Sequence, residues 1–106
     1  MFDGMWTVNF SVPGDAGHGV VVISGDTLLG GDSGYYYAGK VVFSGSKFQG
    51  ELEIIQHSAQ LTSVFGKLSQ FKISITGEIV EGQLTAKANL LGTQAPPMSI
   101  TGKKVV

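Results

Sequence analysis

The sequence predicts an all-β domain, a small antiparallel up-and-down barrel of about eight strands. Apolar and polar residues alternate with a period of two along most of the chain, which is typical of strands with one buried face and one wet face. Short glycine-containing turns separate these segments. The chain has 106 residues, the size of one domain, so a single core over residues 1–106 is expected.

The first three expected strands are short and end at turns. The segment Met5–Val12 carries an apolar face made of Trp6, Val8, Phe10 and Val12. A turn built from Pro13, Gly14, Asp15 and Gly17 follows it. The β-branched segment Gly19–Ser24 favours a second strand. The hairpin dipeptide Gly25-Asp26 then leads to a third strand, Thr27–Leu29.

The fourth and fifth expected strands are longer and follow a glycine-rich loop, Gly30–Gly34. In Tyr35–Ser44, the inward face consists of Tyr35, Tyr37, Val41 and Phe43. After a turn at Gly45, Lys47–His57 shows the clearest alternation. Its inward residues are Phe48, Leu52 and Ile54, and its outward residues are Lys47, Gln49, Glu51 and Glu53.

The apolar spacing changes between Ala59 and Ser69. Leu61, Val64, Phe65 and Leu68 fall at i, i+3, i+4 and i+7, the spacing of one helical face. We expect one short helical turn near 59–69, packed over one end of the barrel. A structured loop is the alternative.

Alternation returns in three last strands. Phe71–Ile79 and Leu84–Leu90 are joined by a hairpin turn at Glu81-Gly82. Pro96-Pro97 cannot donate to a ladder and are expected in the connection before the final strand, Met98–Lys103. Sequential hairpins favour a sheet that closes on itself and hides its edges. An open roll or a small sandwich is the competing shape.

Small residues at inward positions bear on the interior volume. They are Gly39, Gly50, Gly77, Ala86, Ala88 and Gly102. Such residues either let the sheet bend sharply or leave a cavity inside it. A cavity would suit an apolar ligand. Its expected lining is Trp6, Phe10, Tyr37, Phe48, Leu52, Phe71 and Ile73.

A protein interface is expected on the outer face of the sheet. Tyr36 points outward if Tyr35 and Tyr37 point inward. Met5 and Ile55 are apolar residues at other outward positions, and Met and aromatic residues are enriched at interfaces. Charged residues form only 14% of the chain, below the usual quarter. This low fraction favours a face that a partner covers.

Composition argues against several other functions. The net charge is −1, so no electrostatic field favours nucleic acid. There are no cysteines, and His18 and His57 lie in no catalytic or metal-binding pattern. We expect a protein that is not an enzyme and has no cofactor or metal. The first residues, 1–5, show no secretory signal and no apolar run could span a membrane, which favours the cytoplasm.

The order of several motifs resembles a known family. Asp3-Gly4-Met5-Trp6 opens the first strand, Gly17-His18-Gly19-Val20-Val21-Val22 follows, and Gly30-Gly31-Asp32 precedes an aromatic residue and Gly39. These motifs resemble the GrlR-like small β-barrels, named for a negative regulator of type III secretion gene expression. The resemblance is strongest over the first half of the chain.

This resemblance implies a lipocalin-like or calycin-like barrel, often a homodimer, which acts in the cytoplasm. It also implies a regulatory role in which the barrel binds a transcriptional activator and not DNA. The family's regulator presents an acidic stretch to its partner between the fourth and fifth strands. Here that segment, 44–49, reads Ser-Gly-Ser-Lys-Phe-Gln and contains no acid, which indicates a different partner. A carrier of a small apolar ligand is the alternative function.

Overall fold

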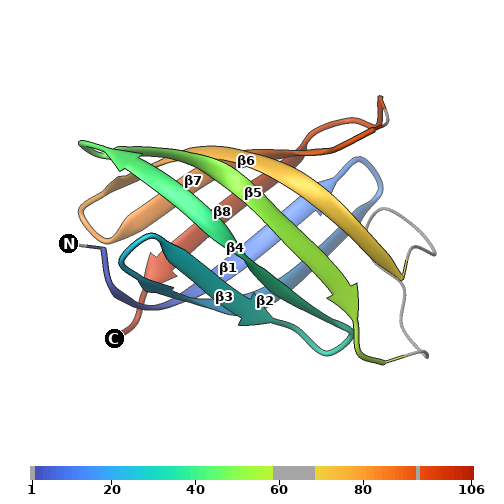
Figure 1. Cartoon of the computed structure of the whole chain (residues 1–106), viewed down its shortest axis with the longest axis horizontal. Helices are drawn as coiled ribbons and strands as arrows, with labels where there is room; N and C mark the ends of the chain where they lie inside the picture. Colours follow the sequence, from blue (N-terminus) through green and yellow to red (C-terminus); the bar gives the residue numbers. More distant parts are fainter. Residues whose placement is uncertain (1, 59–68, 93) are drawn as a thin grey trace.

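The computed structural model describes residues 2–58, 69–92 and 94–106. In these residues, eight antiparallel strands follow one another around a closed barrel (Figure 1). Their bounds are β1 Gly4–Val12, β2 Asp15–Ser24, β3 Thr27–Gly31, β4 Tyr35–Ser44, β5 Lys47–Gln56, β6 Gln70–Val80, β7 Gln83–Leu90 and β8 Met98–Lys104.

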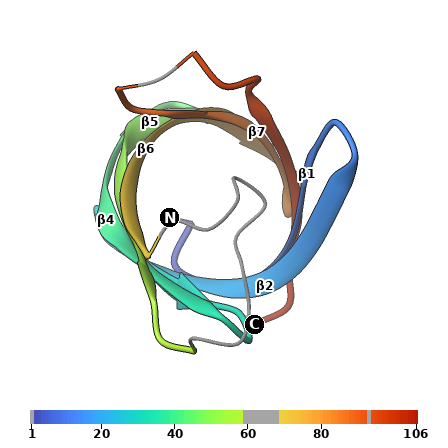
Figure 2. The same ribbon diagram turned by 90° about the vertical axis from the view of Figure 1, so that its right-hand side faces the viewer.

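Each strand pairs with the next one in the sequence, and β1 also pairs with β8. This last pairing closes the sheet, so that the strands form one ring when seen from the end (Figure 2). The predicted all-β up-and-down barrel is confirmed, and the open roll and the sandwich are excluded. Closure gives every strand a paired neighbour on both sides among the described residues.

The core lies inside the ring and is apolar. Trp6, Val8, Phe48, Leu52 and Ile54 are buried as the alternation predicts, and in β7 every second residue from Leu84 to Leu90 is buried. No polar or charged residue is buried among those the structure describes. Burial of the apolar side chains inside the ring is the main favourable contribution to the free energy of folding.

Two strand boundaries differ from the prediction by more than one residue. β2 begins at Asp15 and not at Gly19, because Pro13 and Gly14 alone make the turn and Val12 pairs with Asp15. β3 continues through Gly30 to Gly31, which pairs with Tyr36. Glycines therefore stand within both strands at places where the sequence suggested turns. The helical turn expected near 59–69 falls almost wholly on residues outside the described ranges.

Glycines in β4 and β5 lie where two strands approach each other closely. A β-carbon at Gly39 would collide with the carbonyl oxygen of Glu51, and one at Gly50 would collide with that of Lys40. At Gly77, a β-carbon would lie 2.7 Å from the ring of Phe48. These inward glycines thus accommodate the sharp bending of a small barrel, one of the two roles considered for them.

Candidate functional site

Both chain termini lie at one end of the barrel (Figure 1), and buried side chains pack near them. Trp6 is only 1% exposed, and its indole Nε1 donates a hydrogen bond to the carbonyl oxygen of Phe2 at 3.2 Å. Val41 is fully buried, and the rings of Phe2 and Phe43 lie 5.0 Å apart. None of these four residues lines the cavity described next.

Away from this end, the barrel holds a cavity of about 80 Å³. A single water needs about 10–15 Å³ on the same measure, so the space suits a small molecule. Apolar side chains make nearly the whole wall. The lining consists of Val8, Phe10, Val21, Leu28, Asp32, Tyr35, Tyr37, Phe48, Leu52, Ile54, Phe71, Ile73, Ile75, Leu84, Met98 and Ile100.

The structure brings six of the seven expected lining residues to this cavity. They are Phe10, Tyr37, Phe48, Leu52, Phe71 and Ile73. Trp6 is not among the lining residues, because its indole packs near Phe2 at the end that carries the chain termini. The period-two pattern shows which side chains point inward but does not show how far along the barrel each one lies.

Two glycines of β2 make room for the aromatic part of the wall. A β-carbon at Gly17 would lie 2.6 Å from the ring of Phe10, and one at Gly19 would lie 2.8 Å from the hydroxyl oxygen of Tyr37. The Phe10 and Tyr37 rings meet edge to face with centroids 6.4 Å apart, a favourable aromatic geometry. Gly17 and Gly19 therefore lie directly against the two aromatic residues of the cavity wall and leave the space that their side chains occupy.

Asp32 gives this apolar wall one carboxylate. Its Oδ1 accepts hydrogen bonds from the backbone N–H groups of Gly34 and Tyr35, both at 2.8 Å. Its Oδ2 accepts a hydrogen bond from the hydroxyl of Tyr37. Burial, together with this contact to Asp32, raises the pKa of Tyr37 far above its ordinary range. The phenol is therefore a neutral donor at the edge of the cavity.

His57 has a structural role in the loop that carries Asp32. Its Nε2 lies 2.9 Å from the backbone carbonyl of Asp32, which can only accept, so Nε2 carries the proton. The backbone N–H of His57 also donates to the carbonyl of Gly34 at 2.8 Å. His18, in contrast, is exposed in the middle of β2 opposite Asn9. Among the described residues, no group of three His, Asp or Glu side chains could hold a metal.

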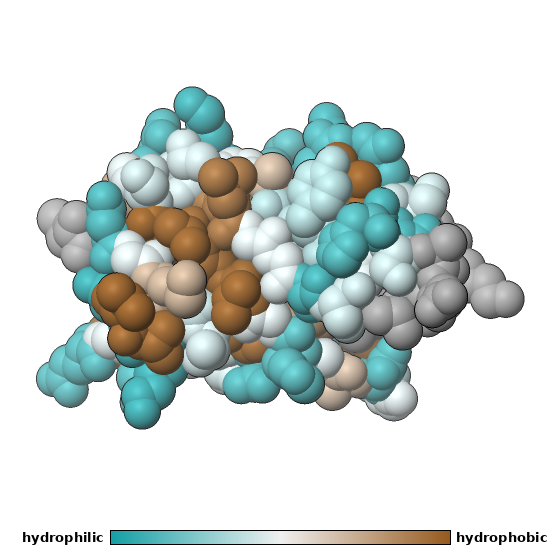
Figure 3. Space-filling model, turned by 90° about the horizontal axis from the view of Figure 1, so that it is seen from below, coloured by the Kyte–Doolittle hydropathy of each residue, from teal (hydrophilic) through white to brown (hydrophobic). Residues whose placement is uncertain are grey.

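A second candidate site is the outer apolar face, which we define as Met5, Val20, Val22, Leu29 and Tyr36. These side chains are between 39% and 52% exposed. The strand register places them in two adjoining rows across the sheet. In the first row, Met5 pairs with Val22, and Val22 pairs with Leu29. In the second row, Val20 and Tyr36 lie on either side of Gly31 and both pair with it. Figure 3, which views the barrel from below, shows hydrophobic residues gathered on one part of the surface.

The expected interface residues all lie on the outside of the sheet. Met5 and Tyr36 belong to the outer apolar face, and the half-buried Ile55 pairs with Tyr36 across β4 and β5. Sequence reasoning missed Val20, Val22 and Leu29. Their signal was present, because each is an apolar residue at an outward position of its strand.

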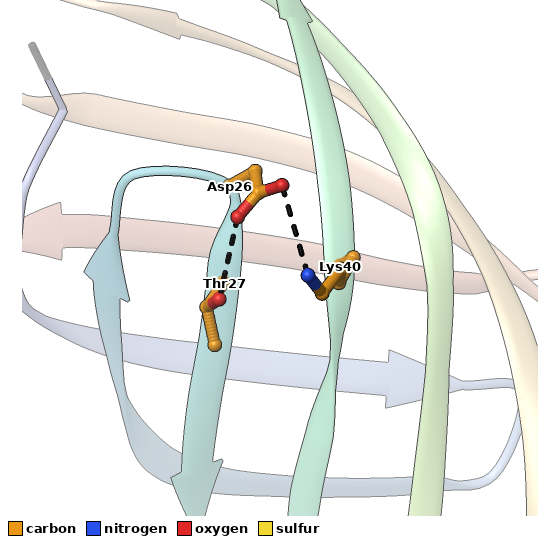
Figure 4. Close-up of polar contacts among 3 residues, drawn as sticks. All are labelled: Asp26, Thr27 and Lys40. Carbon is orange, nitrogen blue, oxygen red and sulfur yellow. Dashed lines mark hydrogen bonds and ion pairs between the residues drawn. The ribbon is translucent and has the colours of Figure 1, made fainter.

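Polar residues border this face on the next row of the sheet. Thr27 pairs with Lys40, and the Lys40 ammonium lies 3.9 Å from a carboxylate oxygen of Asp26 (Figure 4). The other Asp26 carboxylate oxygen accepts a hydrogen bond from the Thr27 hydroxyl at 3.4 Å. Both charged side chains are largely exposed, so the ion pair adds little stability. An apolar centre with a polar border is the usual composition of an interface.

Comparison with known proteins identifies no relative: no protein-family model matches the chain, and no curated protein matches it. Within the part of the chain that the structure describes, no helix has the length and apolar character needed to cross a bilayer. The functional assignment therefore depends on the cavity and on the outer apolar face.

Proposed function

We propose that this chain is a non-catalytic regulatory protein that acts through protein contacts made by the outer apolar face. The observation that carries the proposal is the adjacency of five exposed apolar side chains on β1 to β4. Scattered exposed apolar residues are normal, but adjoining ones mark interaction sites. Because the barrel is closed, a partner binds the face of the sheet and does not add a strand to an edge.

A second copy of this chain is the first occupant that we assign to the outer apolar face. A two-fold dimer places the same patch on both subunits, so the apolar centres meet. The border carries Asp26 and Lys40, so it offers both signs of charge to a second copy. A net charge of −1 gives little repulsion between copies.

The resemblance to the GrlR-like family supports the regulatory part of the proposal and a cytoplasmic location. It suggests that the dimer holds a transcriptional activator or another regulatory protein. The turn between β4 and β5 carries Lys47 and no acid in the segment 44–49. We therefore propose a partner different from one that recognises an acidic turn.

The dimer is tested by placing one charge in the centre of the outer apolar face. Val22→Lys puts an ammonium group there, and Val80→Lys is the matched control because Val80 is similarly exposed on β6, away from this face. Sedimentation equilibrium at micromolar concentrations should show a dimer for the unmodified chain and for Val80→Lys, and a monomer for Val22→Lys. A monomeric unmodified chain would overturn the proposed dimer.

The second candidate function is transport or sensing of a small apolar ligand, and the cavity of about 80 Å³ favours it. A ligand that binds only the folded state raises the melting temperature. Benzene at saturation should therefore stabilise the unmodified chain. Ile100→Phe, which adds volume to the cavity wall, should remove this stabilisation. Equal shifts for both proteins would show that benzene binds elsewhere.

A further inference from the structure

The carboxylate of Asp32 is the only charged group in the cavity wall among the described residues. Its two oxygen atoms have different hydrogen-bond partners. Oδ1 accepts the N–H groups of Gly34 and Tyr35 and so shapes the turn between β3 and β4. Oδ2 faces the Tyr37 hydroxyl and takes no part in the turn. The turn therefore accounts for the hydrogen bonds of Oδ1, whereas Oδ2 bonds to Tyr37, another residue of the cavity wall.

Asp32 and Tyr37 form a polar corner of the cavity wall, and this corner can accept further hydrogen bonds from a ligand. A carboxylate has about four acceptor sites, and three are used by Gly34, Tyr35 and Tyr37. The hydroxyl of Tyr37 gives its proton to Asp32, which leaves the phenol oxygen as an acceptor. Asp32 and Tyr37 can therefore each accept a further hydrogen bond but have no proton left to donate, and both lie at the edge of an apolar cavity.

We propose that the cavity selects small, uncharged apolar molecules that carry one hydroxyl group, and that it rejects carboxylates. Asp32 and Tyr37 are the specificity-determining residues: they accept the hydroxyl proton of the ligand, while the apolar wall holds its hydrocarbon part. This inference depends on the ligand-binding function proposed above as the second candidate.

An alcohol, an ether and a carboxylate of similar size should bind to this cavity with different affinities. A hydroxyl donor adds a hydrogen bond at the remaining acceptor capacity of Asp32 and Tyr37, which a purely apolar molecule leaves unused. An ether of the same size brings only an acceptor and adds no such hydrogen bond. A carboxylate brings a second negative charge next to Asp32 in a poorly hydrated place, which disfavours binding.

Three probes of nearly equal size test the selectivity at neutral pH: n-hexanol, its isomer pentyl methyl ether, and hexanoate. Calorimetric titration of the full chain should show hexanol binding at least about tenfold more tightly than the ether or hexanoate. Equal affinity for all three, or a preference for hexanoate, would overturn the proposed selectivity while leaving a ligand-binding barrel. Binding of none of them would overturn ligand binding and, with it, the selectivity.

Two variants test whether Asp32 and Tyr37 determine the selectivity. Asp32→Asn keeps an oxygen that can accept from the backbone and removes the charge, so hexanoate should bind about tenfold more tightly than it does to the unmodified chain. Tyr37→Phe removes the phenol oxygen, so the preference for hexanol over the ether should shrink. Circular dichroism confirms the fold of each variant. If both folded variants discriminate as the unmodified chain does, the two residues do not set the specificity.

Discussion

The hydroxyl of Tyr37 lies directly against the backbone of Gly19, so that a β-carbon at position 19 would come within 2.8 Å of the phenol oxygen. The same β-carbon would lie 2.7 Å from the carbonyl oxygen of Gly31 on β3. A side chain at position 19 would therefore meet the Tyr37 hydroxyl on one side and the backbone of β3 on the other. Because the backbone cannot move aside easily, the absence of a side chain at Gly19 leaves the space that the Tyr37 hydroxyl occupies.

We predict that Gly19→Ala lowers the free energy of unfolding by about 1–3 kcal/mol, the usual range for overpacking. Urea denaturation followed by circular dichroism measures the change. Gly31→Ala is the matched control, because its β-carbon would lie 3.1 Å from the nearest atom and needs a smaller adjustment. A loss that is no larger for Gly19→Ala than for Gly31→Ala would contradict the proposed contact.

Trp6 provides a second test, at the end of the barrel that carries the chain termini. Trp6→Phe removes buried ring volume and the hydrogen bond to the carbonyl of Phe2, so we expect a loss of about 1–3 kcal/mol in the free energy of unfolding. Tyr36→Phe, at an exposed aromatic position, should change it by less than about 0.5 kcal/mol. Urea denaturation compares the two. Equal losses would show that Trp6 adds nothing specific to that end.

Alkaline pH provides a third test through Tyr37. Its pKa is raised by burial and by Asp32, while in the unfolded chain it is about 10. Below that pH, the phenol is protonated in both states and its contribution to stability is complete. Above that pH, the unfolded chain loses the proton first, so stability falls by up to about 1.4 kcal/mol for each pH unit.

Urea denaturation at two pH values, one below 10 and one about one unit above it, measures this loss. The unmodified chain should lose more stability between the two values than Tyr37→Phe, which has no phenol to ionise at that position. The other ionisable groups are common to both proteins and cancel in the comparison. Equal losses would show that Tyr37 does not resist ionisation in the folded state.

The strands were predictable from the sequence because their physical signal is local. Alternation along β5 and β7 shows which side chains are buried, and two-residue turns such as Gly25-Asp26 show where neighbouring strands pair. Closure followed from the sequence of hairpins and from the need to hide strand edges. These features require no knowledge of distant contacts.

The interior could be predicted only in part, because it depends on contacts between distant segments. Gly17 was assigned to a turn, but it lies in β2 under the ring of Phe10. Asp32 was considered only as part of a glycine-rich loop, and its contact with Tyr37 became visible once β3 and β4 were paired. Trp6 was expected at the cavity, but its depth along the barrel depends on strand stagger, which alternation does not reveal.

The turn between β6 and β7 provides the last prediction. Glu81 has a φ of 51° and is followed by Gly82 with a φ of 75°, and two positive values are typical of a type I′ hairpin turn. A glutamate in this region has a steric cost that asparagine largely avoids, since the short amide side chain tolerates it. Glu81→Asn should therefore raise the free energy of unfolding by about 0.5–1 kcal/mol.

Glu81→Gln separates backbone strain from charge in this turn. It removes the same negative charge but keeps the long side chain, so it should leave the strain unrelieved and change stability little. Urea denaturation of both variants beside the unmodified chain makes the comparison. Equal stabilisation by both would assign the gain to charge, through Glu78 in the same hairpin, because Glu78 and Glu81 carry like charges close together in the sequence.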